Sequence, residues 1–393
     1  MYHLPCGLSA NCTLTESHEH INDASRMKRW LVITIACCVT LGTSAQLDVQ
    51  QTADSIVKYQ MKSGGWPKNQ DWLKGVDPKQ AKEWEKKGIG STIDNGATTK
   101  EMETLAKALE QLDRMVGENS HWLDKELVKE RKKRYTEAFN RGLEFFLDMQ
   151  YDNGGFPQFY PARKKEPYTS QITFNDNATV NVLRLMKGVL ENDDRFKYVV
   201  VEKSIRKKCR AAYEKGIQCI LDCQIRVDES GKVLPYGTDA WKTGKRTVWC
   251  QQHDKKTLAP VKARAYELPS FTGNGETCTI LQFLMDLPNP SAEVREAVKC
   301  GVEWLEAHVM KDMALERFRD EQGREDVRLV KRQGSELWAR YYDLEQAEPM
   351  FCDRDGIPRK HLSDIGYERR TGYSWAGDSP RRVMERYKNW KKQ

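Results

Sequence analysis

The sequence lacks several features that would assign it to a familiar class of protein. Beyond residue 45, no apolar run approaches the roughly 20 residues that a membrane-spanning helix needs. Charges of both signs are spread along the chain, and no tail of like charge forms a nucleic-acid-binding arm. The Asp- and Asn-rich segments do not follow the spacing of an EF-hand loop. We therefore expect no membrane span in this region and no nucleic-acid partner.

The cysteines form no recognisable pattern either. Four of the 11 precede residue 46, and the other seven are an odd number at irregular spacing, which argues against a disulfide framework or a zinc site. These seven are Cys209, Cys219, Cys223, Cys250, Cys278, Cys300 and Cys352. We expect them to be buried as small apolar residues, with one disulfide in an oxidising compartment as the alternative.

Composition favours a soluble protein with a sizeable core. The chain has 393 residues, of which 39% are hydrophobic and 31% are charged, enough for one large domain or two ordinary ones. Its net charge of +7 suits an anionic substrate.

The N-terminal region contains a targeting segment. Met27–Arg29 is basic, the run from Trp30 to Leu41 is almost wholly apolar, and small residues follow up to Ala45. This order is typical of a secretory signal peptide, here residues 27–45, with residues 1–26 as an upstream extension. We expect a secreted or periplasmic protein whose start is Met27. Lipoprotein anchoring at Cys37 is the alternative, although the residues before it match such a signal poorly.

The most informative feature is an internal repeat. Gly64–Pro67 is followed by Thr92–Thr98, and Gly154–Pro157 is followed by Thr173–Thr179. Each copy has a glycine pair, an aromatic residue and a proline, and then an Asp/Asn cluster that opens an apolar helical run. A recurring order of this kind indicates a repeat architecture. It also predicts two carboxylates, Asp94 and Asp176, at equivalent positions in successive units.

A third, weaker copy follows. Gln224 matches Gln60 and Gln150 at the end of a helix, the turn at Pro235–Gly237 takes the place of the glycine motif, and Ser270–Thr277 opens an apolar helix. Helical hairpins that bury one face against the next can close into an α/α ring, with helix N-termini and loops on one side. We therefore expect a mainly α protein: an α/α toroid-like barrel of about three hairpin repeats, with long loops and a few short strands.

Apolar periodicity sets the expected helices. They cover residues 54–62, from about 98 to 115, 131–150, 178–190, 198–224, 278–287 and 292–309. Residues 68–91 read as a long polar loop. The segment from Asp320 onward reads as a loop-rich, basic tail with many aromatic residues.

The Asp/Asn clusters at 94–95 and 175–177 allow two interpretations. Asp and Asn are preferred helix N-caps, so each cluster could simply begin a helix. Two oxygen-rich clusters in matched repeats also suit a hard cation such as calcium, which takes six to eight oxygen ligands. The sequence alone leaves both interpretations open.

Two further segments contain candidate functional side chains. Arg264 lies in a stretch that cannot continue as a long helix, because Pro269 restricts the residue before it. It could equally form a surface pair with Glu267, and His253 could be a structural histidine. Towards the C-terminus, arginines occur among aromatic residues near Arg340, Arg354 and Arg370. Arginine suits the bidentate recognition of carboxylates, and aromatic rings suit stacking on sugars.

Eight ordered segments together resemble polysaccharide lyase family 10, the pectate lyases. They are GGWPKN, TIDNGAT, DNGGFPQFYP, NDNAT, RAYELPS, RYYDLE, FCDRDG and ERRTGYSW. They extend from about residue 50 to about residue 380, so residues 46–393 are expected to form a single catalytic domain. Residues 1–45 lie outside the resemblance.

The resemblance implies calcium-dependent β-elimination on polygalacturonate by an α/α toroid-like domain. Asp94 and Asp176 match the calcium and substrate carboxylates, with Asn95 beside them, and Arg264 matches the proposed catalytic base. Arg340 and Arg354 match arginines that bind substrate carboxylates. His253 and Arg370 are neighbours that would also contact substrate. The expected partner is an acidic polysaccharide, and the expected oligomeric state is a monomer.

The implied chemistry begins at the C5 proton of a galacturonate, made acidic by the carboxylate at C6. Calcium withdraws charge from that carboxylate, a base removes the proton, and the C4–O bond breaks. Arginine is normally a poor base, so an alkaline pH optimum is expected. Two alternatives remain open. A glycoside hydrolase would use Asp94 and Asp176 as acid and base, and a non-catalytic binder of acidic polysaccharide would not need Arg264.

Overall fold

The computed structural model describes residues 48–87, 90–118 and 124–392. The chain divides into two units, residues 1–48 and residues 49–393, and the helical fold belongs to the second unit. The expected signal peptide at 27–45 and Cys37 lie outside the described residues. In the part of the chain that the structure describes, no helix is long and apolar enough to cross a membrane.

Helices dominate this unit, as the sequence predicts. The first described helix covers residues 48–58. The α-helices that follow are α2 (Pro78–Lys87), α3 (Thr99–Glu118), α4 (Lys125–Met149), α5 (Ala178–Glu191), α6 (Lys203–Cys223), α7 (Asp239–Thr243), α8 (Glu276–Met285), α9 (Ala292–Ala307), α10 (Tyr367–Thr371) and α11 (Ser379–Trp390). The 3-10 helices are η1 (Asp94–Gly96), η2 (Pro167–Ser170), η3 (Asn175–Asn177) and η4 (Leu362–Asp364).

Most strands are only two residues long and join loops in antiparallel pairs. The strands are β1 (Ser91–Thr92), β2 (Phe159–Tyr160), β3 (Ile172–Thr173), β4 (Arg226–Val227), β5 (Lys245–Arg246), β6 (Gln252–His253), β7 (Phe271–Thr272), β8 (Met310–Arg319), β9 (Glu325–Ala339), β10 (Tyr341–Tyr342), β11 (Pro349–Cys352), β12 (Pro358–Arg359) and β13 (Ala376–Gly377). β1 pairs with β2, β3 with β6, and β7 with β10. These pairs connect the loops that precede α3, α5 and α8 to later segments of the chain.

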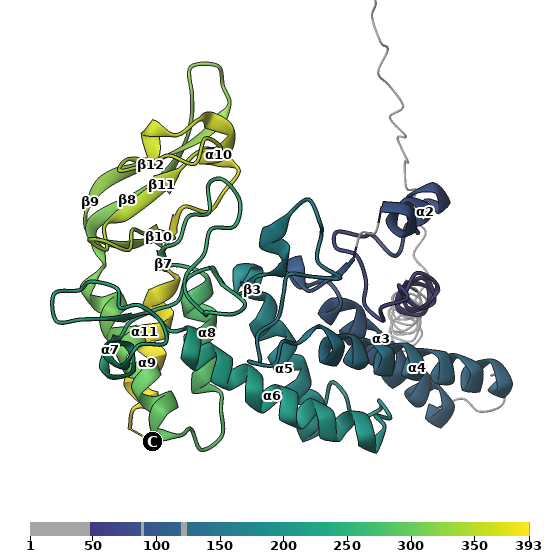
Figure 1. The fold of residues 1–393 in the computed structure, drawn as a ribbon. Coiled ribbons are helices and arrows are strands. Elements are labelled where there is room, and N and C mark those ends of the chain that lie inside the picture. Colours follow the sequence, from purple (N-terminus) through teal and green to yellow (C-terminus); the bar gives the residue numbers. More distant parts are fainter. Residues whose placement is uncertain (1–47, 88–89, 119–123, 393) are drawn as a thin grey trace, which may run out of the picture. The chain divides into compact units, whose positions relative to one another are not determined.

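The helices form successive hairpins, α3/α4, α5/α6 and α8/α9, that pack on one another in order (Figure 1). One row contains α3, α5 and α8, here called the inner helices, and the other contains α4, α6 and α9, here called the outer helices. α11 packs on α8 and α9, so it covers the last hairpin. The hairpins do not close into a barrel within the described residues, and the expected toroid is therefore not confirmed.

Three glutamines join consecutive hairpins in the same way. Their side-chain amides Nε2 donate to a carbonyl in the next outer helix: Gln60 to Ala138 (2.8 Å), Gln150 to Ala212 (2.8 Å) and Gln224 to Ala297 (2.9 Å). The amides of Gln60 and Gln150 also donate to Gly64 and Gly154 (2.6 and 2.9 Å). Because a buried amide must be paired, these bonds fix the spacing of the units. The predicted equivalence of the three glutamines is confirmed.

The third aromatic residue of the repeat is Trp249 rather than a residue of Pro235–Gly237. The amide of Thr92 donates to Trp66 O, that of Thr173 to Phe156 O, and that of Thr272 to Trp249 O. The turn at Pro235–Gly237 belongs instead to the insertion around α7. Sequence order suggested the wrong segment because this insertion separates Gln224 from its tryptophan.

A fourth, partial copy follows, which the sequence analysis missed. The indole of Trp338 donates to Leu305 O (2.7 Å), as those of Trp66 and Trp249 donate to Ile56 O and Ile220 O. β13 pairs with the end of β9, and α11 follows directly. Trp338 and α11 therefore correspond to the aromatic residue and the inner helix of the earlier units.

Two segments expected to be loops have regular structure. Residues 78–87 form α2, which begins with proline at its first position, a favoured helix start. The tail expected to be loop-rich contains much of the β8–β9 hairpin and also α11 (Figure 1). The hairpin is largely exposed and highly charged, so it lacks the clear apolar alternation that identifies a strand in sequence.

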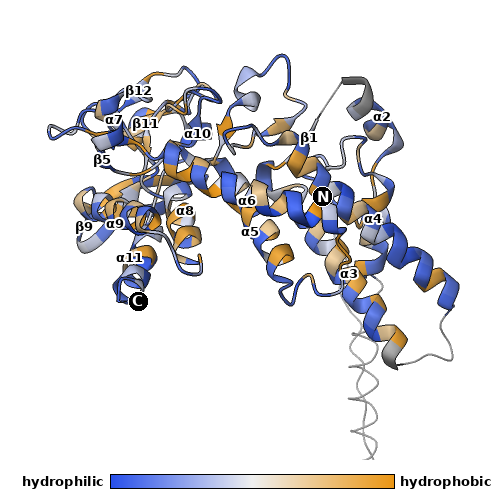
Figure 2. Cartoon of the chain, turned by 60° about the horizontal axis from the view of Figure 1, so that its bottom comes forward, coloured by the Kyte–Doolittle hydropathy of each residue, from blue (hydrophilic) through white to orange (hydrophobic). Residues whose placement is uncertain are grey.

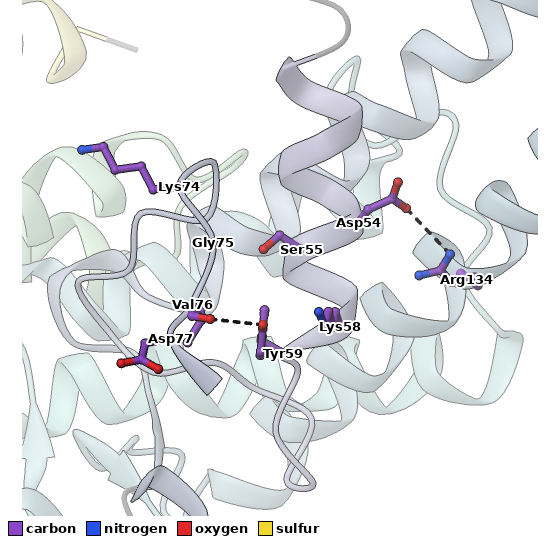
Figure 3. Close-up of a pocket in the computed structure, with 9 residues that line it drawn as sticks. All are labelled: Asp54, Ser55, Lys58, Tyr59, Lys74, Gly75, Val76, Asp77 and Arg134. Carbon is purple, nitrogen blue, oxygen red and sulfur yellow. Dashed lines mark hydrogen bonds and ion pairs between the residues drawn. The ribbon is translucent and has the colours of Figure 1, made fainter. Parts of the chain in front are cut away.

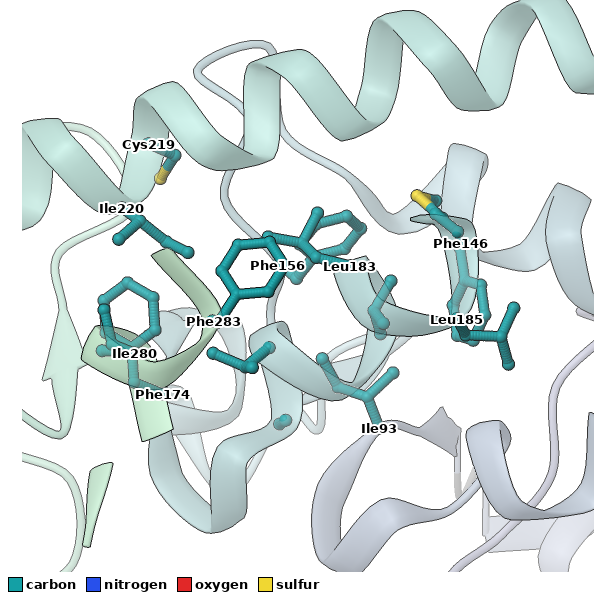
Figure 4. Close-up of a cluster of buried hydrophobic side chains, with 14 of the residues drawn as sticks. Ile93, Phe146, Phe156, Phe174, Leu183, Leu185, Cys219, Ile220, Ile280 and Phe283 are labelled. Carbon is teal, nitrogen blue, oxygen red and sulfur yellow. The ribbon is translucent and has the colours of Figure 1, made fainter. Parts of the chain in front are cut away.

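The core lies between the two rows of helices. In α6 the buried residues recur at helical spacing, and Figure 2 shows hydrophobic and hydrophilic residues on different sides of this helix. Aromatic and aliphatic side chains from the loops, including Phe156 and Phe174, pack against α5, α6 and α8 (Figure 4). The seven cysteines of this unit are buried and make no disulfide bond. This core holds the helix-opening turns in place.

Candidate functional site

The two Asp/Asn turns have the same backbone conformation. Asn95 and Asp176 both have left-handed φ values (54° and 51°), as do the residues after them, Gly96 and Asn177 (73° and 60°). Asn and Asp tolerate this region better than most residues, and Gly best of all. The sequence therefore places these residue types where the chain needs them.

Matching the two turns corrects the predicted equivalence of the carboxylates. The hydroxyl of Thr98 donates to Thr92 O (2.9 Å), and that of Thr179 donates to Thr173 O (2.6 Å). Counted from these threonines, Asp94 corresponds to Asn175, and Asp176 corresponds to Asn95. Asp94 and Asp176 thus occupy neighbouring rather than equivalent positions of the repeat.

The two carboxylates nevertheless approach each other. Asp176 keeps an exposed surface, but burial of its carboxyl group and the negative charge of Asp94 raise its pKa to about 6. Asp94 is buried. Burial acts to raise its pKa, but an ion pair with the ammonium of Lys68 outweighs this effect, and the pKa lies below its usual value. Asp94 Oδ1 is buried and has no hydrogen-bond partner among the described residues. Electrostatic repulsion between the pair is incompletely compensated.

Asn175 connects this pair to a buried arginine. Its Nδ2 donates to Asp176 Oδ2 (3.0 Å), and its Oδ1 accepts from Gln251 Nε2 (2.6 Å) and Arg340 Nη2 (3.3 Å). Arg340 also forms an ion pair with Glu276 at the start of α8. Arg340 is thus held beside the acidic pair, and its charge acts to lower the pKa of Asp176.

The same network reaches Arg264 through Glu267. Gln251 Nε2 donates to Glu267 Oε1 (3.1 Å), and Arg264 donates to Glu267 from Nε (2.7 Å) and Nη2 (2.6 Å). The hydroxyl of Tyr373 also donates to Glu267 Oε1 (3.2 Å). Burial acts to lower the pKa of Arg264, but Glu267 outweighs it and raises the pKa above its ordinary value. The guanidinium is therefore held in its protonated form.

Four repeat-equivalent residues line this network. Each is the second residue after the aromatic residue of its unit, and they are Lys68, Gln158, Gln251 and Arg340. The last three bond to the helix-opening segment of the preceding unit. The side chains of Gln251 and Arg340 bond to Asn175 and Glu276, and the backbone carbonyl of Gln158 accepts from the hydroxyl of Thr92 (2.6 Å). Lys68 belongs to the first unit and pairs with Asp94 of its own unit.

His253 is not available to a substrate. It is fully buried, its Nε2 accepts from the amide of Cys250 (3.1 Å), and its Nδ1 lies 2.7 Å from Leu258 O. Burial lowers its pKa to about 4. His253 therefore supports the loop that carries Gln251, which corrects its predicted contact with substrate. Asn95 lies beside Asp94 in sequence, but its side chain is exposed and donates to Asn69 Oδ1 (3.0 Å).

The remaining predicted arginines differ in position. The guanidinium of Arg354 lies 5.9 Å from the ring centre of Tyr266, and that of Arg264 lies 5.3 Å from the same ring. Arg354 is thus near the candidate base. Arg370 instead forms a bidentate pair with Asp326 in β9 (2.8 and 2.6 Å), so the structure does not bring it to the network. Its neighbour Arg369 lies over Tyr266 and Tyr373 (4.5 and 5.4 Å).

Sequence reasoning missed the residues that connect these groups: Lys68, Gln251, Glu267, Glu276 and Tyr373. The repeat contained a usable signal for the first two, because Lys68 and Gln251 occupy one position of successive units. Glu267 was noted only as a surface partner of Arg264, whereas its side chain is 2% exposed. Tyr373 lay in a recognised motif with no role assigned.

The acidic pair suits a cation that is completed by other ligands. Among the described residues, no group of three or more His, Cys, Asp or Glu side chains could hold a metal ion. Asp94 and Asp176 supply two carboxylates, one with an oxygen that lacks a partner, and a hard cation prefers such donors. Further ligands would have to come from substrate or water.

A separate cavity of about 710 Å³ lies beside the helix at 48–58 (Figure 3). Its lining includes Lys58, Lys74, Asp77 and the ion pair between Asp54 and Arg134 (3.8 Å). None of the nine lining residues is a predicted site residue. The hydrogen-bonded network described above, rather than this cavity, therefore contains the candidate chemistry.

Comparison with known proteins places the chain in a family and agrees with its mainly helical fold. A family model described as pectic acid lyase matches residues 60–384. A family 10 polysaccharide lyase from Cellvibrio cellulosa is 29% identical, with a TM-score of 0.65 over 88% of this chain and 95% of that chain. An aspartate-to-alanine mutant of a family 10 polysaccharide lyase from Cellvibrio cellulosa, in complex with trigalacturonic acid, gives the same identity and TM-score over 86% and 92% of the two chains. No curated protein matches.

Proposed function

This chain belongs to the pectic acid lyase family and is a polysaccharide lyase, and from this premise we propose that it cleaves polygalacturonate by calcium-assisted β-elimination. The products would be 4,5-unsaturated oligogalacturonates. The main structural support is the approach of Asp94 and Asp176 beside Arg340, with Arg264 reached through the same network. A similar structure that binds trigalacturonic acid supports an acidic polysaccharide as substrate.

Asp94 and Asp176 would hold the calcium ion, with the remaining ligands supplied by substrate and water. Bound there, calcium would supply positive charge that stabilises the anion formed when C5 loses its proton. The surroundings of Asp176 support this assignment, because burial of its carboxyl group and the nearby negative charge of Asp94 both raise its pKa, and a cation would offset both effects.

Arg340 would orient the site. Its guanidinium is fixed by Glu276 and Asn175, and it lies 4.5 Å from the ring centre of Tyr373. A positively charged group held so firmly can place a substrate carboxylate without reorganisation. Arg354, which is exposed, would contact a uronate farther along the chain.

Arg264 would accept the C5 proton after its guanidinium has lost a proton to solvent. Its Nε and Nη2 donate to Glu267, and Nη1 makes no hydrogen bond within the described residues. Nη1 is thus the nitrogen available to a substrate. Glu267 opposes loss of a proton from this guanidinium, so the reaction needs alkaline conditions or a weakening of the Glu267 pair when substrate binds.

The test is the ultraviolet absorbance of the conjugated uronate during digestion of polygalacturonate, with and without EDTA. Elimination produces this absorbance and hydrolysis does not. We expect a signal that EDTA abolishes and calcium restores. Cleavage without the absorbance would identify a hydrolase, and binding without cleavage would identify a non-catalytic binder.

The proposed location is the cell exterior or the periplasm, based on the signal-like segment 27–45, with residues 46–393 as one catalytic domain. We also propose that the protein acts as a monomer. Fractionation of the expressing cells and light scattering of the purified protein test these two points.

A further inference from the structure

We propose that Lys68 is a built-in competitor of the cation for Asp94. The inference rests on the proposed cation site at Asp94 and Asp176, and it assigns to Lys68 a role in setting the affinity of that site. The starting observation is the direct ion pair between Lys68 and Asp94, on a carboxylate that is 3% exposed while Lys68 is 30% exposed.

The repeat shows why this lysine differs from its equivalents. Gln251 and Arg340 bond through their side chains to the helix-opening segment of the preceding unit, and Gln158 does so through its backbone carbonyl, so all three join units together. Lys68 belongs to the first unit and has no preceding unit to join. The first unit is already joined to the second, because Gln158 O accepts from the hydroxyl of Thr92 (2.6 Å) and the amide of Ile93 (3.3 Å). The lysine is therefore not needed for the connection that its equivalents make.

The charges at the site favour replacement of the Lys68 ammonium by a divalent cation. Two facing carboxylates carry two negative charges, and one ammonium neutralises only half of them. The negative charge left over includes the buried Asp94 Oδ1, which has no hydrogen-bond partner among the described residues. A divalent cation between the two carboxylates would neutralise both, but the ammonium would then repel it at short range.

Only the side chain of Lys68 has to move. Its loop is fixed on one side by the amide of Trp66, which donates to Thr98 Oγ1 (3.1 Å), and on the other by the indole of Trp72, which donates to Glu101 Oε1 (2.8 Å). Lysine carries its charge on a flexible four-carbon stem. The ammonium can leave Asp94 while the loop stays in place.

The repeat also supplies the test variants. Lys68→Gln introduces the residue of the second and third units, and Lys68→Arg introduces that of the fourth while keeping the charge. Isothermal titration calorimetry without substrate would measure the affinities for Ca²⁺ and for Tb³⁺, a tighter-binding probe. We expect Lys68→Gln to bind both ions about tenfold more tightly or better, and Lys68→Arg to match the unaltered protein.

Thermal melting in EDTA provides a second measurement. Lys68→Gln should melt at a lower temperature than the unaltered protein, because the acidic pair loses its counter-ion, and calcium should raise its melting temperature by more. Circular dichroism would confirm that Lys68→Gln is folded. If it is not, Lys68→Met, which also removes the charge, would replace it in both measurements.

Equal ion affinities with and without the lysine, or no ion binding by any variant, would overturn the role of Lys68. The polygalacturonate assay separates this failure from failure of the proposed function. If elimination is EDTA-sensitive but Lys68→Gln leaves the ion affinities unchanged, only the role of Lys68 is rejected. If elimination persists in EDTA, the calcium site on which the inference rests is rejected.

Discussion

Two arginine–carboxylate pairs lie at opposite ends of the network around Gln251 and Asn175, and they differ mainly in exposure. Arg264 is 38% exposed and pairs with a glutamate that is 2% exposed. Arg340 is 13% exposed, and its partner Glu276 is 3% exposed. A group that reacts with substrate has to be reached from solvent, whereas a group that positions others benefits from burial. The difference in exposure therefore favours the proposed roles, with Arg264 in the chemistry and Arg340 in orientation.

The largest effect on turnover is expected at Arg264. Arg264→Ala removes the proposed proton acceptor, and kcat should fall by about 10²–10⁴-fold, the usual range for loss of a general base. Binding of polygalacturonate should be largely retained. The measurements are ultraviolet absorbance for turnover and calorimetry for binding. An equal loss of turnover and of binding would show that Arg264 binds substrate, the role proposed for Arg340 and Arg354.

The largest effect on stability is expected at Arg340. Arg340→Ala leaves Glu276 buried without a partner, which should lower the free energy of unfolding by about 3–5 kcal/mol. Urea denaturation followed by circular dichroism would measure it.

A double variant, Arg340→Gln with Glu276→Gln, removes both charges and should recover much of this loss. Arg354→Ala is the matched control, because this arginine is 64% exposed and its pair with Glu368 should contribute little. If Arg340→Ala left the free energy of unfolding unchanged, the buried Arg340–Glu276 pair would contribute no more to stability than the exposed Arg354–Glu368 pair.

A smaller, pH-dependent effect is expected at Asp176, which lies beside Arg340. The pKa of Asp176 in the folded protein is about 6, above the unfolded value of about 3.9. Between these values the folded state binds more protons, so its stability falls as pH rises from about 4 to about 6. Asp94, whose pKa is lowered, acts in the opposite direction at lower pH.

Asp176→Asn removes this titration. Without metal, the variant should be more stable than the unaltered protein above about pH 6, by at most about 1 kcal/mol because Asp176 is exposed to solvent. Thermal melting across pH 4–8 in EDTA would measure the difference, and added calcium should reverse the order. Identical pH profiles would mean that the two carboxylates do not interact.

Local sequence was sufficient to predict the helices and turns, which depend on residues close together in the chain. Most long helices follow from apolar periodicity, and the left-handed turns follow from the Asn, Asp and Gly residues that tolerate them. The glutamine at the end of each unit was identified from order alone. The internal repeat singled out the two aspartates, and the family resemblance supplied the roles expected of them and of the arginines.

Errors arose where distant contacts decide the outcome. His253 followed a site-like pattern, but pairing of β6 with β3 buries its ring, whose centre lies 5.6 Å from that of Phe174. Arg370 lies in a matching motif, yet Asp326 in a distant strand holds it away from the network. The exposed β8–β9 hairpin is defined by pairing between its strands, and its sequence has no strong apolar alternation. No local pattern contains such information.

The series of helical hairpins and the residue types at their turns follow from amino-acid order alone, because backbone preferences and apolar spacing act over a few residues. Packing in three dimensions is what brings Asp94 and Asp176, one position out of register in the repeat, close to each other, and it also selects the cations beside them. Ion pairs and pKa values depend on distances between residues far apart in the chain, and packing sets those distances.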